Sequence, residues 1–349
     1  MDYQTTISEL LDGTIPINLN PVKRKYWPRF AFHFTDINNA VEILKLGFIC
    51  SRNYANNHNI MINDNASKEV LSNTHLWVKD MVRLYFRPRT PTQYYNEGFQ
   101  TKKSRDNSNF SANCPVPIFF LFDLNNILDE PDVQFSDKSL ALSTDTKLMS
   151  TPEDFRTLPF DEIYHDSGLE SMTFEKKEEI KQHKHAEIIK KDLLNLDKLK
   201  WIYVRSAAER ETLINLLHAE NIFDYDQIVV IGSESTFYMN RNYIKRVVLE
   251  SNGINIESSV KNAYPDEWGD AKFALNPDNS DDFLDVKLKL IKSDGESFIW
   301  PTNDDQKALL KINQRLNFTN QHNKYGVEIY IDNHIAYKGR YSKQDDLPF

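Results

Sequence analysis

The order of apolar and polar residues predicts a mixed α and β fold over the first two-thirds of the chain. Short apolar runs have the length and residue types of strands, and they occur at 30–34, 82–86, 118–122, 186–189, 201–204 and 228–231. Helices are predicted between Asp36 and Gly47, over a charged stretch from about 174 to 183, and over 206–219. The polar segments 51–75 and 96–113 are expected to be surface loops.

The last third of the chain has a different pattern. It begins with a loop-rich stretch that contains the acids Asp266, Glu267, Asp270, Asp278, Asp281, Asp282 and Asp285. Alternating residues then predict strands at 286–290, 297–300, 327–331 and 335–337, with Asp332 and Asn333 as a hairpin turn. We therefore expect an N-terminal arm at 1–28, a mixed domain at 29–232 and a small β-rich accessory domain at 233–349.

Length and composition are typical of a soluble globular protein. Of the 349 residues, 40% are hydrophobic and 27% are charged. No apolar run approaches the length of a membrane-spanning helix, which needs roughly 18 residues. The first residues have neither the basic flank nor the apolar core of a secretory signal. The two cysteines, Cys50 and Cys114, form no C-x-x-C pair, so we expect a reducing, cytoplasmic environment without a membrane.

The formal net charge of −9 is unfavourable for a protein that coats duplex nucleic acid. The stretch from Lys79 to Arg105 is an exception, because it is nearly free of acids and mixes cations with tyrosine and phenylalanine rings. Cations follow a backbone and rings stack on exposed bases, so this composition suits a single strand better than a duplex. A solvated strand and loop with core aromatics is an equally good interpretation of this stretch alone.

Several common nucleotide and hydrolase signatures are missing. The sequence contains no G-x-x-x-x-G-K-[ST], no G-x-G-x-x-G and no G-x-S-x-G motif. His183 and His185 could contribute to a metal site, but they have no obvious third ligand nearby in the sequence. We therefore expect solvent-facing histidines and no metal.

Two segments carry polar residues on or beside predicted strands. In His33-Phe34-Thr35, alternation sends the imidazole and the hydroxyl to the same face, where they could hold a carboxamide. Taken alone, His33 is better explained as a core histidine that bonds to the backbone. The Pro-rich turn Tyr85–Pro91 could aim a guanidinium at a pyrophosphate and a ring at a nicotinamide, although such turns are more often structural.

A third segment, His183–Ile189, places a carboxylate at the beginning of an apolar strand. If the strand begins at Ala186, Glu187 shares a face with Ile189 and lies at the edge of a core or cleft. The alternative continues the preceding helix, so that Glu187 pairs with Lys191 on the surface. Such a solvated ion pair contributes only about 0.3–0.5 kcal/mol.

Together and in this order, these segments resemble the DarT family of NAD-dependent nucleic-acid ADP-ribosyltransferases, the toxins of bacterial toxin–antitoxin pairs. The resemblance covers about residues 30–231, and its motifs are His33–Gly47, Tyr85–Pro91, P-I-F-F-L-F-D, Phe160–His165 and H-A-E-I-I around Glu187. It implies an α+β ADP-ribosyltransferase fold of two packed β-sheets with helices.

The resemblance also implies the roles of individual residues. It gives NAD binding to His33, Thr35 and Asn38, and the catalytic role to Glu187. The family has a further arginine that holds NAD and assists catalysis, and Arg52 is the residue expected in that role. Tyr85 and Arg89 are expected to contact NAD. The expected contacts to nucleic acid are Arg87, Tyr94, Lys102 and Lys103.

The reaction expected from the resemblance is transfer of ADP-ribose from NAD to a base of single-stranded nucleic acid, with DNA favoured. The enzyme would act as a toxin in a toxin–antitoxin or phage-defence system, and a neutralising antitoxin would be its protein partner. RNA as the acceptor and a protein target remain alternatives. A catalytically silent module that binds nucleic acid or an antitoxin is a further alternative, from a different class.

Overall fold

The computed structural model describes residues 2–60, 74–107, 112–141, 146–260, 281, 283–302 and 308–343. The chain divides into two compact units, each built from several segments. The first unit comprises Met1–Asn96, Ile118–Tyr203 and Ser233–Phe237, and the second comprises Glu97–Pro117, Val204–Gly232 and Tyr238–Phe349. These units do not coincide with the consecutive parts at 1–28, 29–232 and 233–349 that the sequence predicts.

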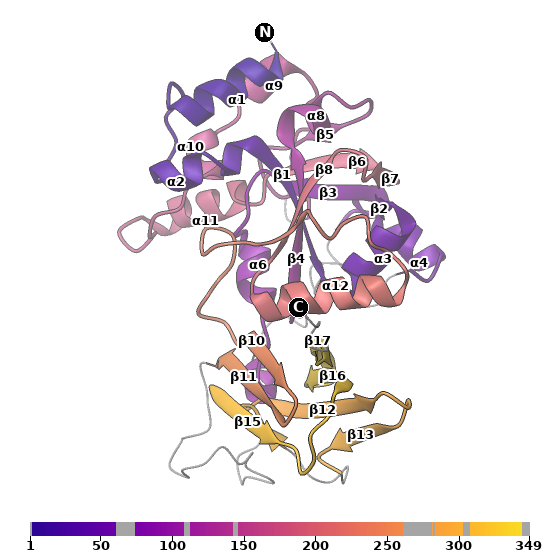
Figure 1. Cartoon of the computed structure of the whole chain (residues 1–349). Coiled ribbons are helices and arrows are strands. Elements are labelled where there is room, and N and C mark those ends of the chain that lie inside the picture. Colours follow the sequence, from indigo (N-terminus) through magenta and orange to yellow (C-terminus); the bar gives the residue numbers. More distant parts are fainter. Residues whose placement is uncertain are drawn as a thin grey trace. The chain divides into compact units, whose positions relative to one another are not determined.

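The first unit is organised around a sheet with helices on both sides (Figure 1). Its neighbouring strands are, in order, β5 (Gln134–Phe135), β6 (Glu187–Lys191), β3 (Met81–Tyr85), β1 (Phe30–Asp36), β4 (Pro117–Asp123) and β8 (Leu199–Val204). The strands expected at 30–34, 82–86, 118–122, 186–189 and 201–204 are confirmed. Residues Pro117 to Phe122 of β4 are all buried, as a continuous apolar run predicts.

Helix α3 (Ile37–Leu46) begins and ends as the sequence predicts. The Asp36 carboxylate accepts a hydrogen bond from the Asn38 amide and caps the first turn. Gly47 ends the helix with a φ of 78°. The loop expected at 51–75 is wrong in its first part, because Arg52–Asn57 form helix α4, capped by the Ser51 hydroxyl. Residues 61–73 of that expected loop lie outside the described residues.

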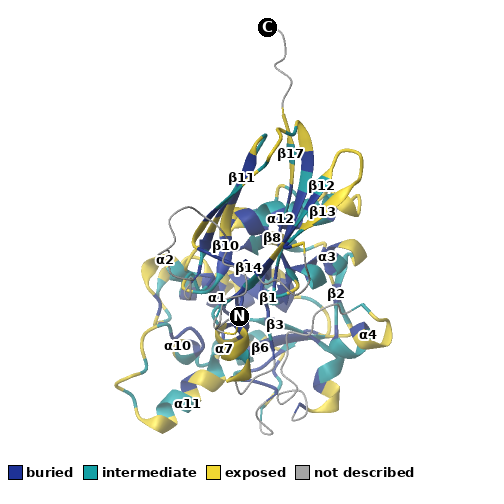
Figure 2. Ribbon diagram, turned by 90° about the horizontal axis from the view of Figure 1, so that it is seen from below, coloured by how far each residue is buried: buried dark blue, intermediate teal, exposed yellow. Residues whose placement is uncertain are grey.

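The remaining elements of the first unit are short. The helices are α1 (Tyr3–Asp12), α2 (Pro21–Arg24), η1 (Trp27–Arg29), η2 (Leu76–Asp80), α6 (Pro91–Asn96), α8 (Leu124–Leu128), α9 (Pro152–Arg156), α10 (Phe160–Ile163) and α11 (Phe174–His183). A two-stranded sheet pairs β2 (Phe48–Cys50) with β7 (Leu193–Asn195). Figure 2 shows the exposed residues along α11 and the buried residues of β1, which match the charged and apolar sequences of these elements.

Aromatic rings fill much of the interior of the first unit. Phe135 makes edge-on contacts with Phe86 and Phe155, at ring-centroid distances of 6.4 and 5.7 Å. Tyr3 of α1 packs on the rings of Phe135 and Phe155, so the N-terminal helix belongs to this core. Among the described residues, no helix is long and apolar enough to cross a membrane.

The second unit contains helix α12 (Ala207–Ala219) and most of the remaining strands. One sheet has the order β10 (Tyr243–Glu250), β11 (Gly253–Ser259) and β15 (Asn313–Asn317). Another has the order β13 (Ser297–Trp300), β12 (Asp285–Lys292), β16 (Lys324–Ile331) and β17 (His334–Ser342), with β14 (Ala308–Leu309) paired to β12. Strand β9 (Val229–Ile231) and short helix α7 (Lys102–Asp106) also belong to this unit.

The mixed fold with a β-rich C-terminal region is therefore confirmed. The turn between β16 and β17 has positive φ angles at Asp332 and Asn333, 48° and 66°. Such angles are typical of a two-residue hairpin. The segment 96–113 is only partly the exposed loop that its polarity predicts. Glu97, Phe99 and Thr101 are buried, whereas 102–104 and 106–107 are exposed, and 108–111 lie outside the described residues.

A buried charge network in the second unit explains why Glu97 is buried. The guanidinium of Arg205 donates to Glu97 at 3.3 Å, to Glu209 through Nε at 3.1 Å, and to the carbonyl of Pro115 at 3.1 Å. It also lies 4.2 Å from the ring centroid of Tyr243. All three charged side chains are almost completely shielded from solvent. Each charge therefore depends on its partners to compensate for lost hydration.

Replacement of Arg205 by methionine should destabilise the second unit strongly, because it leaves two buried carboxylates without this cation. We expect a loss of about 3–5 kcal/mol in the free energy of unfolding, measured by urea denaturation. The matched control is Arg315→Met, which removes a half-exposed partner of Glu250. This control substitution should lower the free energy of unfolding by less than about 1 kcal/mol. Equal effects of the two substitutions would contradict this account of the network.

Candidate functional site

The first unit holds a buried carboxylate in a two-point ion pair. Strands β3 and β6 are antiparallel, with Tyr85 opposite Glu187 and Arg83 opposite Ile189, so these side chains share one face of the sheet. Arg83 Nε lies 2.6 Å from Glu187 Oε2, and Nη2 lies 2.5 Å from Oε1. The alternative in which Glu187 continues a helix and pairs with Lys191 is excluded, since α11 ends at His183.

The two members of this pair differ in their access to solvent. The Glu187 side chain is 0% exposed, whereas that of Arg83 is 28% exposed. The amide of Leu140 also points at Glu187 Oε1, at 3.3 Å. Burial lowers the pKa of the Arg83 guanidinium, but the charge of Glu187 outweighs burial and the net pKa lies above its usual range. Arg83 thus stays cationic and is the more exposed member of the pair.

His33 on β1 joins this group through the backbone of β3. Its Nδ1 lies 3.1 Å from the carbonyl oxygen of Arg83, and because a carbonyl only accepts, Nδ1 carries the hydrogen. The ring stacks on Phe120 at 6.2 Å. Burial lowers the pKa of His33 to about 4, so the imidazole is neutral at neutral pH with its Nε2 lone pair available as an acceptor.

Thr35 and Asn38 lie close to His33 along the chain. Thr35 is buried and shares a face of β1 with His33 by strand alternation. Asn38 is half-buried in the first turn of α3, and its side-chain amide donates to Asp36 at 3.2 Å. The structure therefore links His33, Arg83 and Glu187 through hydrogen bonds. Phe32 lies opposite Tyr85 in the antiparallel pair of β1 and β3, so Thr35 and Asn38 follow His33 in the direction away from Tyr85, and their NAD role stays a prediction.

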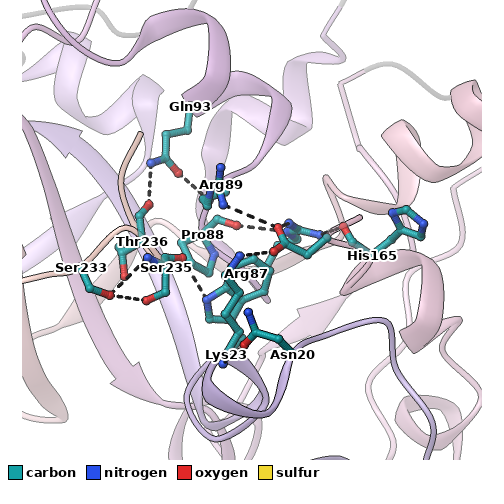
Figure 3. Close-up of polar contacts among 12 residues, drawn as sticks. Asn20, Lys23, Arg87, Pro88, Arg89, Gln93, His165, Ser233, Ser235 and Thr236 are labelled. Carbon is teal, nitrogen blue, oxygen red and sulfur yellow. Dashed lines mark hydrogen bonds and ion pairs between the residues drawn. The ribbon is translucent and has the colours of Figure 1, made fainter. Parts of the chain in front are cut away.

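Tyr85 and Arg89 lie at the end of β3 and in the turn that follows it. Tyr85 is half-buried, and burial raises the pKa of its phenol. Arg89 has a φ of 59°, which is a left-handed conformation. Non-glycine residues adopt this conformation at a cost of about 1–2 kcal/mol. The buried Gln93 side chain holds it, because it accepts from the Arg89 amide at 2.5 Å and donates to the Thr236 carbonyl at 2.8 Å (Figure 3).

Arg87, expected to contact nucleic acid, lies in the interior instead. It is 2% exposed and donates to the carbonyls of Ile163 and His165 at 3.0 and 2.6 Å. Its guanidinium also stacks over the Trp27 ring at 4.5 Å. This burial does not suit a nucleic-acid contact, and we assign Arg87 to the scaffold of the turn. Arg87 and Arg89 lie two residues apart, just beyond the end of β3. The sequence alone does not show which of the two side chains is buried and which is exposed.

The other expected site residues are more dispersed. Arg52 is half-buried at the beginning of α4, and Tyr94 is 50% exposed on α6. Lys102 and Lys103 are exposed on α7 of the second unit, where Lys102 pairs with Asp106 and Asp281. The NAD role of Arg52 and the nucleic-acid roles of the other three therefore stay predictions.

The histidines considered as metal ligands are engaged by protein atoms. His183 Nδ1 contacts the Asp137 carbonyl at 2.7 Å, and His185 Nε2 contacts the Thr92 hydroxyl at 3.1 Å. Both are half-buried rather than solvent-facing, and burial lowers the pKa of His185 to about 4. Within the described parts of the chain, no group of three or more histidine, cysteine or acidic residues is arranged to hold a metal ion.

Sequence reasoning missed Arg83 and Asp166. Arg83 is the polar member of an alternating strand, which a solvated position explains equally well, and its partner is 104 residues away. Asp166 follows the F-D-E-I-Y-H segment directly and accepts from Arg87 at 3.3 Å. The register of two strands could have identified the first pair, but a single sequence does not fix that register.

In comparisons with known proteins, the model of one protein family matches this chain. A family model described as "ssDNA thymidine ADP-ribosyltransferase, DarT" matches residues 32–238, which is more than half of the chain. The matched segment contains His33, Arg83 and Glu187. A comparison with curated proteins gives no match.

Similar solved structures include two of a DarT from Thermus sp. 2.9. The complex with ADP-ribosylated ssDNA has a TM-score of 0.48 and 17% identity, over 60% of this chain and 97% of that chain. The complex with NAD+ has a TM-score of 0.46 and 16% identity, over 60% and 98%. Thermosipho africanus DarTG in complex with ADP-ribose has a TM-score of 0.45 and 18% identity, over 62% and 53%.

The His33 imidazole should titrate far below an ordinary histidine. Its folded pKa of about 4 lies below the usual value, so the folded state binds fewer protons between the two values. The stability that neutral His33 contributes is therefore fully present at neutral pH and falls as the pH drops from the usual histidine pKa toward 4. NMR of histidine-labelled protein, assigned with His33→Gln, checks the midpoint. An ordinary histidine midpoint in the folded protein would overturn the burial argument.

A double-mutant cycle should reveal the strength of the Arg83–Glu187 pair. Arg83→Gln leaves a buried carboxylate without its cation and should cost about 3 kcal/mol of unfolding free energy. Adding Glu187→Gln removes the uncompensated charge, so the double variant should recover a large part of that loss. Urea denaturation of all four proteins gives the coupling energy. Additive effects would show that the pair does not stabilise the fold.

Proposed function

Because the chain belongs to the DarT family of ssDNA thymidine ADP-ribosyltransferases, we propose that it transfers ADP-ribose from NAD to a thymidine base of single-stranded DNA. The observation that carries this proposal is the shielded Glu187 carboxylate, fixed at two points by Arg83 and adjacent to the His33 ring through the β3 backbone. These residues lie on neighbouring strands of one sheet and within the segment that the family model matches.

The bond that breaks joins C1′ of the ribose to the nicotinamide nitrogen. Nicotinamide takes the bonding electrons and leaves as a neutral molecule, so its departure needs no general acid. Positive charge then develops on the ribose. A carboxylate stabilises such an oxocarbenium-like centre electrostatically, and this effect is largest where water is excluded. We assign this role to Glu187.

Arg83 controls access to that carboxylate. Glu187 is fully buried and Arg83 pairs with it at two points, so we propose that the guanidinium shifts when a ribose contacts the carboxylate. The ion pair holds the carboxylate in one orientation until then, which reduces the entropy that must be lost when the sugar arrives.

The acceptor is the nucleophile in the second half of the reaction. A ring nitrogen of the base forms the new bond to C1′ and loses its proton, which Glu187 can accept. The base must leave its stack to reach a buried carboxylate, and this costs least in a single strand. This requirement and the family description both favour single-stranded DNA as the acceptor. No observation specifically favours RNA or a protein target.

The neighbouring polar residues bind the donor. We assign the nicotinamide end of NAD to His33, Thr35 and Asn38, because a neutral imidazole, a hydroxyl and an amide can bond a carboxamide and ribose hydroxyls without adding charge. Tyr85 and Arg89 extend this surface beyond the end of β3. Arg52 is a further donor-binding candidate from α4.

We also propose that the enzyme acts as a toxin with a neutralising antitoxin partner. Membership of the DarT family supports this role, which the sequence resemblance implies, but it does not identify the partner. Co-expression would test it, because an antitoxin must restore growth of cells in which the active enzyme is toxic and a Glu187→Gln variant is not.

Glu187→Gln should retain the fold and lose transfer, because an amide keeps the shape of the carboxylate without its charge. We expect a fall in rate on the order of 10²–10³-fold or more. The assay incubates full-length protein with NAD and a thymidine-containing oligonucleotide, and mass spectrometry detects the added ADP-ribose. Glu162→Gln, which removes a partly buried carboxylate paired with Lys176, is the control and should remain active.

Two results would contradict the proposal. Unchanged transfer by Glu187→Gln would remove the assignment of the carboxylate. A wild-type protein that leaves NAD intact with DNA, RNA and protein acceptors alike would instead indicate a module that binds without catalysis.

A further inference from the structure

Exposed aromatic rings occur in the first unit on elements that carry none of the residues assigned to the proposed function. In β8, Ile202 and Val204 are buried, so strand alternation places Trp201 and Tyr203 together on the opposite, more exposed side. Trp201 is 39% exposed, and Tyr26, directly before η1, is 50% exposed. Groups of large exposed rings are uncommon on a protein surface and often mark a binding site.

The segment that contains Tyr26 lies close to β8. Helix η1 leads directly into β1, and β4 lies between β1 and β8, so two strand spacings of about 4.8 Å separate β1 from β8. Trp27 Nε1 of η1 donates to the Ser235 carbonyl at 3.2 Å. Three residues before Ser235, the Gly232 amide donates to the Val204 carbonyl at the end of β8, at 2.8 Å. One short stretch of chain therefore connects η1 with the end of β8.

The three rings form one surface. Burial raises the pKa of the Tyr203 phenol, and the nearby Tyr26 phenol raises it further, as expected for neighbouring side chains. Trp201 lies two residues from Tyr203 on the same side of β8. Among the described aromatic side chains, none stacks on Tyr26, Trp201 or Tyr203. We call these three residues the aromatic surface.

Cations without partners belong to the same two segments. Lys25 and Arg29 flank η1, Lys200 is in β8, and all three are exposed. Within the described parts of the chain, none of the three side chains forms an ion pair or a hydrogen bond. Residues 13–35 also include no acid. In a chain with a net charge of −9, the aromatic surface is thus associated with local positive charge that no described side chain neutralises.

We propose that the aromatic surface, together with Lys25, Arg29 and Lys200, binds the acceptor single strand several nucleotides away from the base that is modified. Rings stack on bases of any sequence, and cations follow the phosphates. A protein partner could also use exposed rings, but unpaired cations in segments poor in acids favour a polyanion. This inference rests on the proposed function, because the strand is that of the DNA acceptor.

The strand order sets the distance between the aromatic surface and the candidate catalytic carboxylate. Strands β3, β1 and β4 lie between β6, which begins with Glu187, and β8. Four spacings of about 4.8 Å give about 19 Å. Phosphates along one stacked strand are about 3.4 Å apart, so this distance corresponds to about five or six nucleotides. A trinucleotide at Glu187 therefore does not reach the aromatic surface, whereas a 12-mer does.

Full-length Tyr26→Ala and Trp201→Ala test the aromatic surface. Fluorescence anisotropy without NAD gives the affinity for a thymidine-containing 12-mer, and transfer assays give kcat/KM for the 12-mer and for a trinucleotide. Each variant should bind the 12-mer about tenfold more weakly and leave kcat/KM for the trinucleotide unchanged. Phe174→Ala removes an exposed ring of α11 and is the control, which should bind like the wild type. Trp201→Phe keeps a stacking ring and should retain most of the affinity, which separates stacking from folding.

The salt dependence of binding tests the cations. Lys25→Gln and Arg29→Gln should each lower the salt slope of 12-mer binding by about 0.7, because each removes one phosphate contact. Lys191→Gln, which replaces an exposed lysine of β6, is the control and should leave the slope unchanged.

Three results would overturn the inference. Unchanged affinity of both Ala variants for the 12-mer would show that the strand does not contact the aromatic surface. Equal losses with the 12-mer and the trinucleotide would indicate a disturbed active site instead of a remote contact. An unchanged DNA affinity with an altered sedimentation mass would assign the surface to contacts between copies of the protein.

Failure of this inference can be distinguished from failure of the proposed function. A protein that binds the 12-mer in a manner that depends on Trp201, but transfers nothing, overturns the catalytic proposal and supports the aromatic surface. A wild-type protein that binds no oligonucleotide overturns both.

Discussion

The Arg83–Glu187 ion pair is the interaction on which the organisation of the site depends. A carboxylate with no exposed surface must be compensated, and the two-point contact from the next strand does so. That contact requires β3 and β6 in one register, since a shift of one residue would turn one of the two side chains to the opposite face. The ion pair therefore fixes three features together: the register of the two strands, the orientation of the carboxylate, and the position of the carbonyl that bonds His33.

Local patterns in the sequence predict the strands and helices of this site better than they predict which side chains pair with one another. Apolar runs identify β1, β3, β4 and β6, and the Asp36 and Gly47 caps identify α3, because these features depend on residues close in sequence. The position of Glu187 at the beginning of a strand follows from the same reasoning. Arg83 could not be assigned to Glu187, because pairing across 104 residues depends on tertiary register. The burial of Arg87 likewise depends on carbonyls from a distant segment.

Two arginines in one turn illustrate how backbone conformation separates structural from functional side chains. Arg87 and Arg89 lie two residues apart, yet the first ends in the interior and the second is partly open. Arg89 has a positive φ, and its amide donates a hydrogen bond to the Gln93 side chain, which holds this unusual backbone geometry. Residue type alone does not distinguish the buried arginine from the exposed one. The left-handed backbone of Arg89 does.

The threading of the chain through its two units limits how the protein can be divided. The segments 97–117 and 204–232 fold with the C-terminal strands, although the candidate catalytic residues come before and between them. Helix α12 packs against β10 and β17, and Arg205 stacks on Tyr243, so both lose their partners without the last third of the chain. The β-rich region is thus not a detachable module that recombination could exchange at a single joint. Any relative that lacks it must cover these surfaces differently.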